Sequence, residues 1–342
     1  MRSGWVSQGR VTEDFEDTLA NYCGSTNAIA VNNGSSALLC ALIAHGAKPN
    51  DLVLVPDYTH VATGNVPRLL GCRVSLVDID PSTMNVDYHA LERAIRMKHP
   101  KFVIVVDVAG LPNDVELLSV LARRYRFTLI EDAAESIGAE YKERRVGSHG
   151  HTTILSFHAA KQLTTVEGGA VLTNDSAVAT RCRLVRNHGE PPHRKYHSEL
   201  VGMNLRTTDI QSAIGMAQLK KVDRYLSTRN HVACLYRKRL PKSLSFQLIP
   251  SYVTKHANMM FIAVTRSRKI RDALKRHLEE EGIETRIPWP PLHQHPQFKA
   301  SRGVFQHSSN LYDRAISLPM YNTITDFEVE RVVAEVRAFE SG

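Results

Sequence analysis

Short apolar runs rich in β-branched residues recur along the first half of the chain, separated by segments long enough for a helix. Six runs are predicted to be strands, at residues 52–55, 74–77, 102–106, 127–130, 153–155 and 170–172. Helices are expected between them at 63–70, 88–97 and 114–125. Strands that alternate with helices favour crossover connections, which join parallel strands. The predicted fold class is therefore α/β, with a mostly parallel sheet in a large domain.

The pattern changes after the last of these strands. Apolar residues at helical spacing predict one long helix over 208–240 that ends at Pro241. A strand, a charged helix, a proline-rich stretch and a last helix are expected at 259–264, 270–281, 287–296 and 326–339. Such a mixture is typical of a smaller α+β domain. We expect a large domain over 1–225 and a small C-terminal domain over 226–342, joined by the long helix.

Composition excludes several classes of protein. No uncharged apolar run approaches the ~20 residues that a bilayer span needs, and the N-terminus lacks a signal-peptide pattern. The five cysteines contain no C-x-x-C pair, so neither a disulfide framework nor a metal site is expected. The net charge of +8 suits an anionic substrate, but the basic residues are scattered and no nucleic-acid-binding motif accompanies them. A cytoplasmic protein with no nucleic-acid or membrane partner is predicted.

Polar residues that follow the strand runs are the candidates for a site, because ligands of parallel α/β sheets bind beyond the carboxyl ends of the strands. The first motif is Asn32-Asn33-Gly34-Ser35-Ser36, which leads into apolar residues at helical spacing. A glycine and two serines at the start of a helix offer free N–H groups, hydroxyls and the positive end of the helix dipole, which suit a phosphate. The same residue types are also ordinary helix N-caps.

The second motif is the segment from Glu131 to Glu135, directly after the run 127–130. It places Asp132 at the carboxyl end of a strand. A buried carboxylate there needs a cationic or hydrogen-bonding partner to offset its desolvation, and a protonated pyridine nitrogen is one such partner. An aspartate that caps the next helix is the alternative interpretation.

The third motif runs from Ser156 to Gly169 and contains Lys161 among apolar and small residues. This setting suits a nucleophilic amine that forms an imine, although a surface lysine beside a glycine turn is the common alternative. Together the three motifs supply an anion cup, a carboxylate and an amine, each at a strand end. Pyridoxal 5′-phosphate needs these three groups, and we predict it as the cofactor.

The sequence resembles the DegT/StrS family of pyridoxal-phosphate-dependent nucleotide-sugar aminotransferases, which have the aspartate-aminotransferase type fold. The similarity extends over nearly the whole chain, from Ser3-Gly4-Trp5 to the segment S-L-P-M at 317–320. Its most specific block is S-F-x-x-x-K-x-L-T-T-x-E-G-G at 156–169. N-N-G-S-S-A-L, I-E-D-A-A-E-S-I-G-A and N-L-R-T-T-D are further matching segments.

The resemblance implies roles for residues around the cofactor ring. Lys161 would hold the cofactor through an imine and later carry the proton between substrate and cofactor. Asp132 would keep the ring nitrogen protonated. His60 stands where relatives usually have an aromatic residue stacked on the ring, and Glu135 stands where they often have glutamine near the phenolic oxygen.

The resemblance also implies how the cofactor phosphate is held. Gly34, Ser35, Ser36 and Ser156 would bind it within one subunit. Asn204 would reach the phosphate of the cofactor in the neighbouring subunit, so that the active unit would be a homodimer with shared active sites.

The implied reaction transfers an amino group from L-glutamate to a keto group of a nucleotide-linked (deoxy)sugar. Arg286 and His293 lie on either side of the rigid segment Ile287-Pro288-Trp289-Pro290-Pro291 and are candidates for substrate contacts, with a purely structural loop as the alternative. A relative of the same fold that acts on a carbocyclic or other keto substrate in a cyclising or dehydrating reaction is a second possibility, although Lys161 argues against dehydratases, which carry histidine there. A cofactor-free binding or regulatory homologue is a third.

Overall fold

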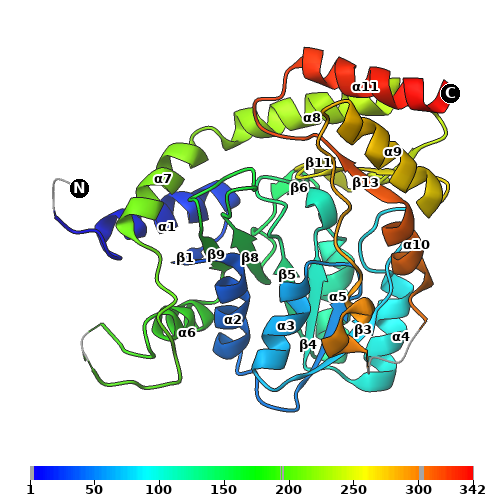
Figure 1. Ribbon diagram of the computed structural model, residues 1–342. Helices are drawn as coiled ribbons and strands as arrows, with labels where there is room; N and C mark the ends of the chain where they lie inside the picture. Colours follow the sequence, from blue (N-terminus) through cyan, green and yellow to red (C-terminus); the bar gives the residue numbers. More distant parts are fainter. Residues whose placement is uncertain (1–3, 193, 195, 300–303, 342) are drawn as a thin grey trace.

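The computed structural model describes residues 4–192, 194, 196–299 and 304–341, so Ser3 of the motif Ser3-Gly4-Trp5 lies outside them. A seven-stranded sheet with the order β1-β9-β8-β5-β4-β2-β3 forms the centre of the molecule (Figure 1). Its strands are β1 (Asn27–Val31), β2 (Leu52–Pro56), β3 (Arg73–Val77), β4 (Phe102–Val106), β5 (Thr128–Asp132), β8 (Thr152–Ser156) and β9 (Gly169–Thr173).

The sheet is mostly parallel, as predicted. The pairs β2–β3, β2–β4, β4–β5 and β5–β8 are parallel, whereas β8–β9 and β9–β1 are antiparallel. The loop between β8 and β9 contains no helix, and without a crossover helix the chain returns antiparallel. The strand β1 is an addition to the six runs expected from the sequence.

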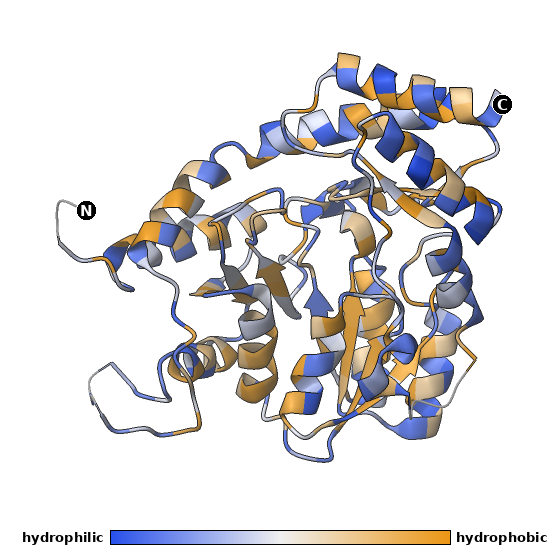
Figure 2. Ribbon diagram, in the orientation of Figure 1, coloured by the Kyte–Doolittle hydropathy of each residue, from blue (hydrophilic) through white to orange (hydrophobic). Residues whose placement is uncertain are grey.

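Apolar side chains cover both faces of this sheet because they alternate along each strand. In β4, Phe102 and Ile104 belong to the core that includes Leu38 of helix α2 (Gly34–Ala44). Val103 belongs to the core on the other face, with Leu118 of helix α5 (Val115–Tyr125). The central strands are correspondingly apolar in Figure 2, and the outer helices alternate between apolar and polar residues.

Helices pack on both faces of the sheet and extend beyond it (Figure 1). They are α1 (Arg10–Cys23), α2 (Gly34–Ala44), α3 (Val61–Leu69), α4 (Tyr88–Lys98), α5 (Val115–Tyr125), α6 (Ser176–Arg186), α7 (Asp209–Leu219), α8 (Val222–Arg239), α9 (Arg268–Glu280), α10 (Gln306–Arg314) and α11 (Asp326–Ser341). Within the described ranges, none of these helices combines the length and the apolar character that crossing a membrane requires.

The prediction of a single helix over 208–240 is wrong, because the chain forms two helices, α7 and α8, with a bend at Lys220 and Lys221. Neither lysine is a helix breaker, so the cause lies in packing. Helix α7 is tied to α1 through Asp209, whose Oδ1 accepts hydrogen bonds from the N–H groups of Gly9 (2.8 Å) and Thr12 (3.0 Å). Helix α8 runs on beside α11 (Figure 1).

The C-terminal part of the chain has a core of its own. A three-stranded antiparallel sheet consists of β10 (Ser245–Phe246), β12 (Phe261–Val264) and β13 (Ala315–Leu318). Its apolar side chains pack with those of α8, α9 and α11. A second small sheet is formed by β6 (Glu140–Tyr141), β7 (Arg144–Arg145) and β11 (Val253–Lys255).

Candidate active site

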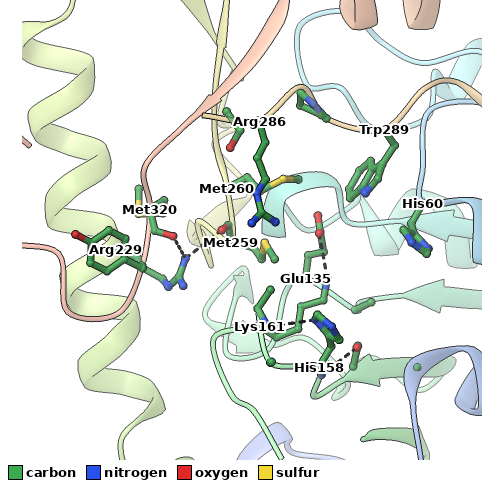
Figure 3. Close-up of a pocket in the computed structure, with 18 of the residues that line it drawn as sticks. His60, Glu135, His158, Lys161, Arg229, Met259, Met260, Arg286, Trp289 and Met320 are labelled. Carbon is green, nitrogen blue, oxygen red and sulfur yellow. Dashed lines mark hydrogen bonds and ion pairs between the residues drawn. The ribbon is translucent and has the colours of Figure 1, made fainter. Parts of the chain in front are cut away.

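A cavity of about 1000 Å³ lies between the main sheet and the C-terminal part of the chain. The part of the chain around the main sheet contributes the start of α2, the end of β5 and the loop after β8. The C-terminal part contributes residues of segments 282–289 and 317–324. Residues from the three sequence motifs therefore share one cavity, whose wall is shown in Figure 3.

Lys161 lies in the loop after β8 and lines the cavity. Its Nζ atom is 3.2 Å from Oε1 of Glu135, and the two side chains are only 14% and 5% exposed. The other carboxylate oxygen of Glu135 accepts a hydrogen bond of 3.0 Å from the N–H of Ala109. Glu135 is thus fixed at both oxygens, and it holds the amine at the cavity (Figure 3).

Asp132 is the last residue of β5 and is buried at the same cavity. Its Oδ2 accepts a hydrogen bond from the hydroxyl of Thr63 (2.8 Å), and its Oδ1 accepts one from the N–H of Ala134 (3.2 Å). Burial raises the pKa of Asp132, although these two hydrogen bonds act in the opposite direction. No side chain in the described part of the chain forms an ion pair with it, so a cation bound in the cavity would relieve the cost of its burial.

The start of α2 forms another part of the cavity wall. Asn33 caps this helix, since its Oδ1 accepts a hydrogen bond of 2.8 Å from the N–H of Ser36. Gly34, Ser35 and Ser156 line the cavity together. A Cβ atom at Gly34 would lie only 3.0 Å from Cβ of Ser156, so glycine permits the close approach of helix and strand. The resulting cup at a helix N-terminus suits a phosphate group.

His60 also lines the cavity, as the N-cap of α3. Its Nδ1 accepts a hydrogen bond of 3.3 Å from the N–H of Ala62, and its ring centre is 6.4 Å from that of Trp289. Burial lowers the pKa of His60, and the positive charge of Lys161 lowers it further. The lowered pKa favours the neutral imidazole, a flat uncharged ring at the cavity.

Two residues expected to hold the phosphate do not line the cavity within the described part of the chain. Ser36 is buried behind the helix cap, and Asn204 is exposed, in an isolated bridge with Asn187. Of the candidate substrate contacts, Arg286 lines the cavity. His293 does not line it and instead contacts the buried carboxylate of Asp57 through Nδ1 (2.6 Å).

Sequence reasoning missed Thr63 and Arg229 as residues of this cavity. Thr63 stands at the start of the helix expected over 63–70, and its sequence context assigns it no role. Arg229 is one of many basic residues on α8, and nothing in its sequence context distinguishes it. Its position depends on the packing of α8 against segments that are distant in the sequence.

The loop between Lys161 and β9 contains a strained residue. Val166 has a φ of 71°, in the left-handed region that β-branched residues strongly disfavour, and its side chain is exposed. We expect Val166→Gly to increase the free energy of unfolding by about 1 kcal/mol, because relief of strain exceeds the added freedom of the unfolded chain. Urea denaturation measures this, with Val201→Gly as the control at an exposed valine with negative φ. A loss of stability in both variants would contradict the assignment of strain.

A buried carboxylate, a glycine-serine cup and a lysine meet at the carboxyl ends of a mostly parallel sheet. These residues fit pyridoxal phosphate, which offers a cationic ring nitrogen, a phosphate and an aldehyde to the three groups. Fold and site together define the class of pyridoxal-phosphate-dependent enzymes with the aspartate-aminotransferase type fold.

The chain belongs to the DegT/DnrJ/EryC1/StrS aminotransferase family, which it matches over residues 1–337. It is 36% identical to a GDP-perosamine synthase of Caulobacter vibrioides over 98% of this chain and 91% of that protein. It is 33% identical to a GDP-perosamine synthase of Escherichia coli O157:H7 over 99% and 93% of the two chains. A solved DegT DnrJ EryC1 StrS aminotransferase from Brucella abortus superposes with a TM-score of 0.94, at 30% identity, over 100% of this chain and 93% of its own. The predicted family, fold class, aminotransferase activity and cofactor are confirmed.

Proposed function

We propose that this aminotransferase moves the amino group of L-glutamate to a keto group of a nucleotide-linked sugar, and that a GDP-linked sugar is the first candidate. The observation that carries the proposal is the meeting of Lys161, Asp132 and the Gly34 cup in one cavity. The identity to two GDP-perosamine synthases supports the substrate class. The cavity, at about 1000 Å³, has room for a substrate much larger than an amino acid.

Lys161 is assigned two tasks, attachment of the cofactor and transfer of the proton at the reacting carbon of the substrate. Pyridoxal phosphate, when bound, supplies an aromatic ring that accepts the electron pair released at that carbon. The short contact between Lys161 and Glu135 supports these tasks, because it keeps the amine at one place in the cavity. A base held at a fixed position is what repeated proton transfer requires.

Three further side chains are assigned to the cofactor ring. Asp132 would pair with the ring nitrogen, which is supported by its burial and by the absence of an ion-pair partner for it among the described residues. His60 would lie against a face of the ring, in keeping with its neutral imidazole. Glu135 would lie near the phenolic oxygen. The hydrogen bond from the N–H of Ala109 restricts the rotation of its carboxylate.

The phosphate is assigned to Gly34, Ser35 and Ser156, which line the cavity, and to Ser36, the next residue along α2. Asn204 is assigned to the cofactor of the neighbouring subunit, in a homodimer with shared active sites. Its exposure on its own subunit, away from the cavity lining, supports this assignment.

We also propose the boundary between residues 225 and 226 for the two domains, and a cytoplasmic location. The change of core along α8 supports the boundary, since Leu226 packs with the main-sheet residues and Val232 packs with the C-terminal core. The five free cysteines support a reducing compartment.

The function is tested by incubation of the purified enzyme with L-glutamate and a panel of GDP-linked and other nucleotide-linked 3-keto and 4-keto sugars. We expect formation of one aminated nucleotide sugar, with 2-oxoglutarate in equal amount. Amination of a carbocyclic ketone in place of every nucleotide-linked sugar would contradict the proposed substrate class.

A further inference from the structure

Arg229 of α8 is a buried cation that no carboxylate of the described residues neutralises. The residue is only 3% exposed. Its Nε donates a hydrogen bond to Oδ1 of Asn322 (2.8 Å). Its Nη1 contacts the carbonyl oxygens of Asn258 and Met259, both at 3.0 Å, and that of Met320 at 3.4 Å. Burial lowers the pKa of Arg229 to about 10, so the guanidinium still carries its charge at neutral pH.

The remaining nitrogen of this guanidinium is available to a ligand. Nη2 has no hydrogen-bond acceptor among the described residues, and Arg229 lines the same cavity as Lys161. Figure 3 shows its guanidinium pointing from α8 toward the centre of the cavity. Carbonyl oxygens satisfy hydrogen bonds but leave the charge unbalanced, and a buried charge without a counter-charge is destabilising. An anion bound in the cavity would balance it.

The position of Arg229 indicates which of the two anionic substrates, L-glutamate or the nucleotide-linked sugar, it contacts. Its partner Asn322 donates a hydrogen bond of 3.2 Å to the carbonyl oxygen of Gln162, the neighbour of Lys161, so this cation lies at the reacting end of the cavity. Arg286, by contrast, is 77% exposed and paired with Glu284. In an amino acid the carboxylate is bonded directly to the reacting carbon, whereas in a nucleotide sugar the phosphates are separated from the keto carbon by the sugar ring. Arg229, the cation at the reacting end of the cavity, is therefore placed to bind the carboxylate of the amino acid.

We propose that Arg229 binds the carboxylate of the amino donor, at the carbon that exchanges the amino group. This inference rests on the proposed amino transfer and adds to it the residue that recognises the donor. The hydrogen bonds to Asn322 and to the three carbonyl groups hold the guanidinium in place before the donor arrives, so little rotamer entropy is lost on binding. Arg286, which is the more exposed of the two arginines, would then bind the phosphates of the nucleotide sugar.

The test is the dissociation constant of glutarate, which has the carboxylates of glutamate but no amino group and does not react. Calorimetric titration of the holoenzyme measures it. We expect Arg229→Gln to weaken glutarate binding by about 30-fold or more, the effect of removing one partner of a buried charge pair. Arg286→Gln removes the same charge at the rim and is expected to change it by about 3-fold or less. Equal weakening in both variants, or wild-type affinity in Arg229→Gln, would overturn the proposal.

Arg229→Lys keeps the experiment informative if the glutamine variant fails to fold. It retains the charge but has a single nitrogen in place of the guanidinium fork, so binding about 10-fold weaker than wild type is expected, and unchanged binding would overturn the proposal.

The two halves of the reaction are then followed separately by absorbance. Impaired reaction with glutamate but not with the aminated sugar supports the assignment of Arg229. A wild-type enzyme that binds glutarate through Arg229 but aminates no nucleotide-linked sugar would support the donor site and contradict the proposed function alone.

Discussion

Replacement of Lys161 by alanine is expected to reduce turnover by about 10⁴-fold or more, because the variant lacks the amine that we propose as the base moving the proton at the reacting carbon. The loss should appear in the first half of the reaction, as failure of glutamate to change the absorbance of the bound cofactor. Rapid-mixing spectroscopy under single-turnover conditions measures this directly.

The same variant separates chemistry from binding. The cup at Gly34 and the carboxylate of Asp132 remain, so we expect Lys161→Ala to bind pyridoxamine phosphate and to gain thermal stability from it. Lys142→Ala is the matched control, because Lys142 is an exposed lysine paired with Glu116 outside the cavity lining and its loss should leave turnover unchanged. Turnover of Lys161→Ala within tenfold of wild type would exclude the proposed role.

Asp132→Asn is the second variant with a large expected effect, a fall in the rate of about 100- to 1,000-fold. Asparagine has nearly the same shape and can accept the hydrogen bond from the N–H of Ala134 while its amide donates to the Thr63 hydroxyl. The fold is therefore preserved, and the negative charge that we propose to pair with the ring nitrogen is removed. Steady-state kinetics with glutamate measures the fall.

Thr63→Val is the control for this variant. It removes a hydrogen bond to the same carboxylate but leaves the charge, so we expect a fall in rate of about tenfold or less. If Asp132→Asn retained at least a third of the wild-type rate, or if Thr63→Val were equally slow, the charge of Asp132 would not be the feature that matters.

The inner residues of this site could be predicted from sequence because strand periodicity also fixes where strands end. Asp132 and Lys161 each follow a predicted strand run, whereas Gly34 is indicated by its glycine-serine motif at a helix start, because the preceding strand β1 is not among the predicted runs. The carboxyl ends of parallel strands lie at one edge of a sheet, so residues far apart in sequence were expected to meet. The structure places all three at one cavity.

The remaining features depend on contacts that no local pattern records. Arg229 reaches the cavity because α8 packs against the segments that carry Met259 and Met320. The bend at Lys220 and Lys221 occurs at residues that are good helix formers, where the helix leaves α1 and continues beside α11. Tertiary packing overrides local propensity at such positions.

The most direct test of the central claim is reduction of the purified holoenzyme with borohydride, followed by mass spectrometry of its peptides. A reduced carbon–nitrogen bond is stable, so the pyridoxyl group remains on the lysine that held it. We predict loss of the visible absorbance and a pyridoxyl group on the peptide that contains Lys161. Attachment to another lysine, or an enzyme that aminates its substrate with no lysine modified after reduction, would contradict the assignment of this site.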